Sequence, residues 1–171
     1  ADSCDVFIDE GYYTLEEGRA ILQRARDFGL AARIHADELV NTESASLAVD
    51  LGALSADHLL KISDPGIEKI AASQTVAVLL PGTAFYLKAP YAPARKLLDQ
   101  GACVALATDF NPGSSVVLAL PAIMTLAALY MNMSAAEIFA GVTYNAAKAL
   151  WLQWTKGTLE VGRNADFACL P

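Results

Sequence analysis

Residues 103–115 read CVALATDFNPGSS, an apolar run that ends in one carboxylate and continues into a turn sequence. Side chains two apart on a strand share a face, so Cys103, Ala105, Ala107 and Asp109 should point the same way. In a closed parallel barrel the interior is packed in layers, and the carboxyl ends of the strands open into the active site. Asp109 therefore has the position of a metal ligand. An Asp before a Pro-Gly segment also caps turns, and this residue alone leaves both interpretations open.

Four earlier runs have the same strand-like composition. They are Cys4 to Ile8, Ala32 to His35, Leu54 to His58 and Thr75 to Leu80, and Cys103 to Thr108 is the fifth. Helical patterns fill most of the gaps, and no hairpin signal occurs between the runs. Successive βα steps of this kind require a parallel sheet, and runs this apolar predict that both faces of the sheet are covered. We therefore expect an α/β fold, a (β/α)8 barrel.

The gaps between the runs carry recognisable helix boundaries. The first has a capping box over Thr14 to Glu17 and Gly29 at the expected helix end. Further helices are predicted over Asn41 to Leu51, after Asp64-Pro65 and over Arg95 to Gln100. Residues 116–133 carry no charge, which on length alone would suggest a membrane span. Pro121, Thr125 and Asn132 instead favour a buried helix that starts near Leu120 and packs against the sheet.

Length and composition set further limits. An eight-stranded barrel usually takes ~250 residues. The 171 residues here supply about five strands, so we expect an incomplete barrel. A net charge of −7 excludes the basic surface that nucleic acid or an anionic membrane would need. Three scattered cysteines and no signal-peptide pattern favour a reducing cytoplasm.

Titratable side chains follow several of the predicted strands. The only two histidines, His35 and His58, stand at the ends of neighbouring strands, and Glu38 follows the first of them closely. The catalytic residues of parallel barrels lie at these strand ends. Each histidine alone could instead be a hydrogen-bonded, partly buried side chain. His35 and Asp109 are suitable ligands for zinc or ferrous iron, but two ligands do not complete a mononuclear site.

Two further features fit a catalytic site around such a metal. Glu38 and His58 suit proton transfer or oxyanion stabilisation, while an acid at a helix N-terminus is the alternative interpretation of Glu38. Residues 111–115, NPGSS, offer an amide, hydroxyls and backbone N–H groups as a cradle for a substrate carboxylate. An ordinary Pro-Gly turn explains the same residues without any ligand.

Four ordered blocks of sequence resemble the imidazolonepropionase family of the amidohydrolase superfamily. They are Ile34 to Leu39 (IHADEL), Ser55 to Leu59 (SADHL), Leu80 to Leu87 (LPGTAFYL) and Ala107 to Ser114 (ATDFNPGS). The tail from Gly157 to Ala168 also looks like that superfamily. The resemblance implies the C-terminal portion of a metal-dependent (β/α)8 barrel over residues 1–155, with residues 156–171 starting the C-terminal strand segment of a small β domain.

The resemblance also implies an activity and a set of site residues. Members hydrolyse the ring amide of 4-imidazolone-5-propanoate to N-formimidoyl-L-glutamate, a step of histidine degradation, with one zinc or iron ion in each full-length site. His35 and Asp109 match metal ligands, and Glu38, His58 and Asp109 match catalytic positions. Residues matching substrate contacts are Glu38, Asn111, Gly113 and Ser114. The family's other two ligands belong to a His-x-His motif that this sequence lacks.

Other functions and partners stay open at this point. Another amidohydrolase acting on a heterocyclic amide or amine would share the metal chemistry. A catalytically silent structural fragment is the alternative from a different class, because we expect this chain alone to be incomplete for activity. The expected partners are a small-molecule substrate, with no nucleic acid and no membrane, and either a second copy in a homodimer or a companion N-terminal segment.

Overall fold

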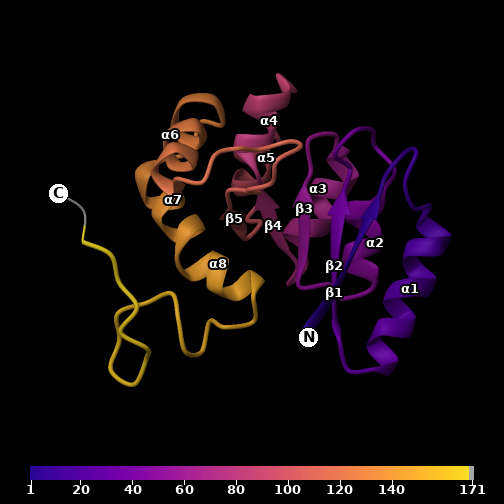
Figure 1. The fold of residues 1–171 in the computed structure, drawn as a ribbon, viewed down its shortest axis with the longest axis horizontal. Helices are drawn as coiled ribbons and strands as arrows, with labels where there is room; N and C mark the ends of the chain where they lie inside the picture. The colour runs from indigo at the N-terminus through magenta and orange to yellow at the C-terminus, as the bar shows by residue number, and fades with distance from the viewer. Residues whose placement is uncertain (170–171) are drawn as a thin grey trace.

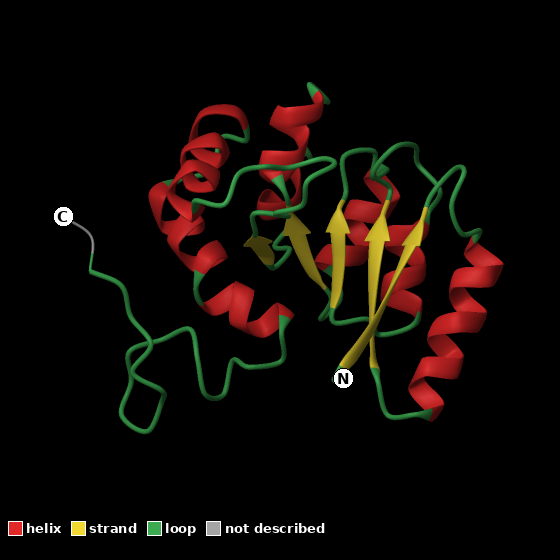
Figure 2. Ribbon diagram, viewed as in Figure 1, coloured by secondary structure: helices red, strands yellow, loops and turns green. Residues whose placement is uncertain are grey.

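The computed structural model describes residues 1–169, which form a five-stranded parallel sheet with strands in the order of the chain (Figures 1 and 2). The strands are β1 (Ser3–Ile8), β2 (Ala31–Ala36), β3 (Ser55–His58), β4 (Val76–Leu79) and β5 (Val104–Leu106). The helices are α1 (Leu15–Asp27), α2 (Ser44–Asp50), α3 (Asp64–Ala71), α4 (Pro81–Leu87), α5 (Ala94–Asp99), α6 (Leu120–Tyr130), α7 (Ala135–Val142) and α8 (Tyr144–Ala149). The five predicted strands and their parallel pairing are confirmed.

Helices α1, α2, α3 and α5 follow the strands in βα alternation and pack on one side of the sheet (Figure 2). Thr14 and Glu17 form the predicted capping box, which begins α1 by satisfying backbone N–H groups at the helix start. Buried Ile8, Ile34 and Leu22 belong to the core between these helices and the strands. These helices therefore cover one face of the sheet, and the candidate site lies on the opposite face.

The opposite face differs from the expectation that helices cover the whole sheet. Val76, Val78 and Ala105 form an apolar cluster with Ala149 of α8, so α8 covers β4 and β5 there. Over β1 and β2 the same face carries Asp5 and other polar side chains, and Asp5 keeps 39% of its side chain exposed. The alternation of polar and apolar residues in β1 and β2 explains the difference, because it is typical of strands with one solvated face.

Helix α6 begins at Leu120 with Pro121 in its first turn, as predicted. Its expected packing against the sheet is wrong, since its contacts are chiefly with α4 and α7. Only Ile123 and Ala127 are buried, while Leu129 is 67% and Tyr130 54% exposed. The uncharged composition of residues 116–133 does not indicate which elements α6 packs against. None of the described helices combines the length and the apolar composition needed to cross a membrane.

Helix α4 approaches the loop after β5 very closely. A Cβ atom added to Gly82 would lie 3.0 Å from Ser115 Oγ and 3.3 Å from the Thr108 carbonyl oxygen. Ser115 is fully buried, and its hydroxyl donates to that same carbonyl at 2.9 Å. Glycine at this position therefore lets the start of α4 lie directly against the backbone that leads into Asp109.

Candidate active site

Three strands of the sheet end in a non-glycine residue with left-handed backbone. These are Asp37 after β2 (φ 48°), His58 at the end of β3 (φ 76°) and Asp109 after β5 (φ 50°). Such conformations are uncommon for residues with a Cβ and cluster at functional sites, where the surrounding structure holds them. All three mark the carboxyl edge of the sheet, where barrel enzymes place their chemistry.

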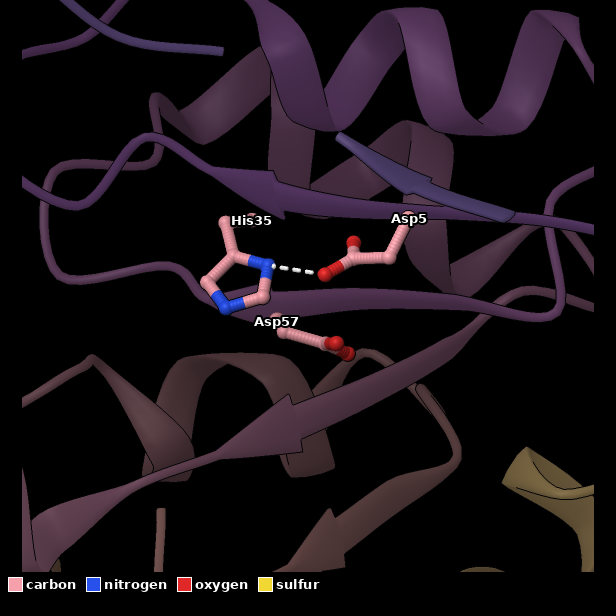
Figure 3. A group of neighbouring side chains, drawn as sticks. All are labelled: Asp5, His35 and Asp57. Carbon is pink, nitrogen blue, oxygen red and sulfur yellow. Dashed lines mark ion pairs between the residues drawn. The ribbon is translucent and has the colours of Figure 1, made fainter. Parts of the chain in front are cut away.

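His35 extends from β2 toward Asp5 of β1 (Figure 3). Its Nδ1 lies 2.7 Å from Asp5 Oδ2, and this contact raises the pKa of His35. Asp5, His35 and Asp57 of β3 each offer a ligand atom within 4.8 Å of the others. Burial raises the pKa of Asp57 to about 6. His35 therefore stands between two carboxyl groups on the solvated face of the sheet.

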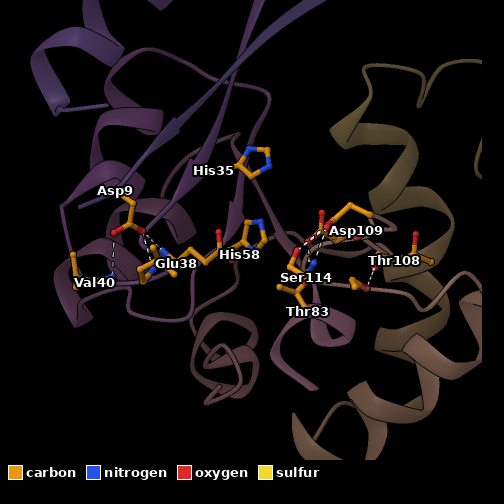
Figure 4. Close-up of polar contacts among 12 residues, drawn as sticks. Asp9, His35, Glu38, Val40, His58, Thr83, Thr108, Asp109 and Ser114 are labelled. Carbon is orange, nitrogen blue, oxygen red and sulfur yellow. Dashed lines mark hydrogen bonds and ion pairs between the residues drawn. The ribbon is translucent and has the colours of Figure 1, made fainter. Parts of the chain in front are cut away.

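His58 contacts His35 on one side and faces Glu38 on the other (Figure 4). The two imidazole rings have centroids 5.1 Å apart, and His58 Nδ1 lies 3.4 Å from Glu38 Oε1. Strand alternation would turn His58 to the helix-covered face with Ala56, but its positive φ ends the strand and changes the direction of the chain. Burial lowers the pKa of His58 to about 4 and raises that of Glu38 to about 7.

Asp9 holds the segment that carries Glu38. One of its carboxylate oxygens, Oδ2, accepts hydrogen bonds from the backbone N–H groups of Glu38 and Leu39 at 3.0 and 2.8 Å, and Oδ1 accepts from Val40 at 3.1 Å. Asp9 is only 4% exposed, so these bonds form in a poorly solvated environment where they are strong. The sequence analysis missed this role, which the acidic residue directly after the first strand could have signalled.

Asp109 accepts a 2.5 Å hydrogen bond from the hydroxyl of Thr83, which is fully buried at the start of α4 (Figure 4). Ala105, Ala107 and Asp109 all line one cavity of about 290 Å³, but so does Leu106, and β5 ends before Asp109, so the predicted alignment with Cys103 stays a prediction. His35 and Asp57 line the same cavity. The structure thus brings the two predicted metal ligands to one space, although the close group of ligand atoms around Asp5 does not include Asp109.

The loop after Asp109 is held by its own residues. Asn111 Oδ1 accepts hydrogen bonds from the N–H groups of Gly113 and Ser114, and Asn111 Nδ2 donates to the Asp109 carbonyl at 2.9 Å. The Ser114 hydroxyl also contacts Asn111. These bonds fit the turn interpretation of Asn111, and none of the three predicted substrate contacts in this loop lines the cavity of His35 and Asp109. Substrate binding by Asn111, Gly113 and Ser114 stays a prediction.

The donor set suits the metal that the resemblance implies. An imidazole and a carboxylate facing one cavity are ligand types that zinc and ferrous iron accept. Because catalytic zinc normally has three protein ligands, His35 and Asp109 are part of a site to which other residues must contribute.

The amidohydrolase family model matches residues 11–170 of the chain. Imidazolonepropionases are among the similar curated proteins. The one from Clostridium tetani is 46% identical over 99% of this chain, and the one from Geobacillus sp. strain WCH70 is 50% identical over 97%. The chain spans only 41% and 39% of the lengths of these two relatives.

Solved structures show the same fold at low sequence identity. An adenosine deaminase from Xanthomonas campestris with bound zinc has a TM-score of 0.75 at 19% identity, over 91% of this chain and 40% of that one. A variant of the atrazine chlorohydrolase TrzN from Arthrobacter aurescens, complexed with zinc and atraton, has a TM-score of 0.74 at 21% identity, over 95% and 41%. The family model covers most of the chain, and the parallel sheet agrees with these neighbours. The chain therefore belongs to the amidohydrolase family.

Proposed function

We propose that this chain is part of an enzyme that hydrolyses the ring amide of 4-imidazolone-5-propanoate to N-formimidoyl-L-glutamate. The observation that carries the proposal is the meeting of His35, Glu38, His58 and Asp109 at the carboxyl edge of one parallel sheet. Its support from comparison is the 46% to 50% identity to curated imidazolonepropionases. The substrate is a small molecule, and the cytoplasm is the compartment we propose.

His35 and Asp109 would hold one zinc or iron ion, together with ligands from outside this chain. When bound, such an ion lowers the pKa of water and polarises a carbonyl, which makes amide hydrolysis feasible at neutral pH. Thr83 holds the Asp109 carboxylate through its 2.5 Å hydrogen bond, so that carboxylate has a fixed orientation. Asp109 is also able to accept a proton from the attacking water at its other oxygen.

Glu38 and His58 have different tasks in this proposal. Burial raises the pKa of Glu38 to about 7, where a carboxyl group both accepts and releases protons near neutral pH. Burial lowers the pKa of His58 to about 4, so its imidazole is neutral at pH 7. A neutral imidazole N–H is a hydrogen-bond donor for the oxyanion that forms on the attacked carbonyl. Glu38, as the carboxylate, would accept the proton of the attacking water, directly or through Asp109, and then deliver it to the leaving ring nitrogen.

The loop from Asn111 to Ser114 would bind the propanoate carboxylate of the substrate. Gly113 is exposed, and its N–H and the Ser114 hydroxyl both donate to Asn111 Oδ1. A bound carboxylate would take over these donors from the Asn111 side chain. Because the Asn111 side chain is already bonded within the loop, its part is to shape the turn that presents the other two residues.

A second candidate is an amidohydrolase that acts on a different heterocyclic amide or amine. The solved neighbours favour it, since an adenosine deaminase and a triazine-hydrolysing enzyme share this fold. A catalytically silent fragment is the third possibility, favoured by the open polar face over β1 and β2.

The test uses two proteins side by side. One is this chain, and the other, which we call the extended protein, joins it to the part of the Geobacillus sp. imidazolonepropionase that it does not match. We expect only the extended protein to hold about one metal ion per chain and to hydrolyse 4-imidazolone-5-propanoate, with Asp109→Ala removing both properties. Metal binding without turnover of this substrate would favour the second candidate, and a metal-free extended protein would favour the silent fragment.

A further inference from the structure

Asp5 and His35 lie on the same face of the sheet because of the register of β1 and β2. Asp5 pairs with Arg33 and Phe7 pairs with His35, so the carboxylate lies one residue pair below the imidazole on the same face. Its Oδ2 is 2.7 Å from His35 Nδ1, an ion-pair contact in which the oxygen lies off the direction of a well-aligned N–H hydrogen bond. No step of the proposed mechanism uses Asp5.

The chemistry of imidazole makes this contact important for a metal ligand. A neutral histidine carries a proton on one ring nitrogen and a lone pair on the other, and only the lone pair binds a metal. A carboxylate has no proton to give at neutral pH, so a nitrogen beside it must be the donor. Figure 3 marks the ion pair between Nδ1 and Asp5, with the other ring nitrogen on the far side of the ring from that carboxylate.

We propose that Asp5 is a positioning residue that keeps the proton of His35 on Nδ1 and thereby leaves Nε2 as the metal-binding atom. This inference rests on the proposed metal site of His35 and Asp109. Carboxylates that accept the second N–H of a ligating histidine fix its tautomer and ring orientation. Asp5 acts through His35 and touches neither the substrate nor the reacting atoms.

The same geometry has one competing explanation. Asp5, His35 and Asp57 could themselves bind an ion, since their ligand atoms lie within 4.8 Å of one another. If Nδ1, the nitrogen beside Asp5, is the atom that binds this ion, it carries the lone pair, opposite to our proposal. The two explanations differ in the tautomer of His35 and in the number of ions per chain, and both quantities are measurable.

The first experiment measures metal affinity in the extended protein. Zinc is the probe, its dissociation constant is obtained by competition with a chromophoric chelator, and circular dichroism confirms folding. We expect Asp5→Ala to weaken zinc binding about 10- to 100-fold, the usual effect of losing such a partner. Asp5→Asn keeps an acceptor oxygen and should recover part of the loss. Asp2→Ala, which removes an exposed carboxylate beside the same strand, is the matched control.

The second experiment reads the tautomer directly in metal-free protein. The ring nitrogen NMR shifts of His35, assigned by comparison with His35→Gln, should report a protonated Nδ1 in the parent and in Asp5→Asn. Asp5→Ala should move the proton toward Nε2. An unprotonated Nδ1 in the parent, unchanged zinc affinity in Asp5→Ala, or a second zinc ion that this variant loses would each overturn the proposal.

Failure of the proposed function gives a different pattern. If the parent binds zinc, shows the Nδ1 tautomer and does not hydrolyse 4-imidazolone-5-propanoate, the substrate is wrong and the role of Asp5 stands. If Asp5→Ala does not fold, the Asp5→Asn variant and the parent tautomer still decide the matter. A parent with its proton on Nε2 overturns the role of Asp5 even when turnover is normal.

Discussion

The hydroxyl of Thr83 donates to Oδ2 of Asp109 at 2.5 Å, which joins the first turn of α4 to the residue that follows β5. Thr83 is fully buried, so its donor has little access to competing water. The bond occupies one carboxylate oxygen and leaves the other for a metal or a water molecule. A side chain 26 positions earlier in the chain therefore sets the orientation of the proposed ligand.

Removing the Thr83 hydroxyl should lower the metal affinity of the site without creating a cavity in the core. Thr83→Val keeps the shape of the side chain but cannot donate, and we expect the zinc affinity of the extended protein to fall about 10-fold. Thr83→Ser should restore most of the affinity. Thr125→Val is the control, since the exposed Thr125 hydroxyl donates to the Pro121 carbonyl within its own helix. Equal zinc affinities for parent and Thr83→Val would contradict the role of Thr83.

Glu38 should control the pH dependence of turnover near neutrality. Its pKa is about 7, so the carboxylate that accepts a proton is present above that pH and disappears below it. In Glu38→Gln we expect kcat to fall about 100-fold or more and the limb of kcat/KM near pH 7 to vanish. Glu10→Gln, which changes an exposed acid after the neighbouring strand β1, should keep the parent profile.

The same carboxyl group should also affect stability in a defined direction. Its pKa in the folded protein exceeds the ordinary 4.5, so the folded state binds this proton more tightly than the unfolded state. Its contribution to stability is therefore present below about pH 4.5 and is lost as the pH rises through about 7. In thermal melts of the extended protein, the melting temperature of Glu38→Gln should rise relative to that of the parent as the pH increases across that interval. A difference in melting temperature that does not change with pH would refute the raised pKa of Glu38.

Glu137 should show the opposite dependence. Its hydrogen bonds from Arg95, at 2.9 and 3.0 Å, lower its pKa to about 2. The stabilisation is present above the ordinary pKa of 4.5 and is lost as the pH falls toward 2. Since the pair lies near the surface, we expect a small effect, seen as a flatter acid limb of the melting temperature in Glu137→Gln. Glu68→Gln, on an exposed helical site, is the control.

Asp37 should matter for folding more than for chemistry. Its carboxylate accepts hydrogen bonds from backbone and hydroxyl groups of Thr42 and Ser44 and from the N–H of Ala45. The side chain is 1% exposed, so Asp37→Ala leaves buried donors unpaired at the start of α2. We expect a loss of ~3 kcal/mol in unfolding free energy, measured by urea titration. Asp27→Ala, on exposed α1, should cost far less.

The strands were predictable because their apolar runs are short and regularly separated by helix signals. The capping box at Thr14 and the Pro121 start of α6 followed from local chemistry as well. The packing partner of α6 was not predictable, since an uncharged helix fits against a sheet or against other helices equally well. Alternation along a strand gave the wrong face for His58, and Asp109 lies beyond the end of β5, where alternation no longer applies.

The contacts that organise the site lie beyond local patterns. Thr83 reaches Asp109 only because α4 begins immediately after β4 and Gly82 allows close approach. Asp9 reaches the backbone of Glu38 across two parallel strands. Each contact depends on the register of neighbouring strands, which sequence composition does not specify.

The left-handed residues at the strand ends have a consequence for engineering. Glycine adopts such backbone angles without strain, whereas each other residue held there costs ~1–3 kcal/mol. Substituting glycine at His58 (φ 76°) or Asp109 (φ 50°) would relieve that cost while deleting a proposed catalytic group. Glycine would also leave the buried Thr83 hydroxyl without its acceptor at Asp109 and a cavity at the buried His58, so the strain cannot be removed without a comparable loss, and libraries built on this chain should hold both positions fixed.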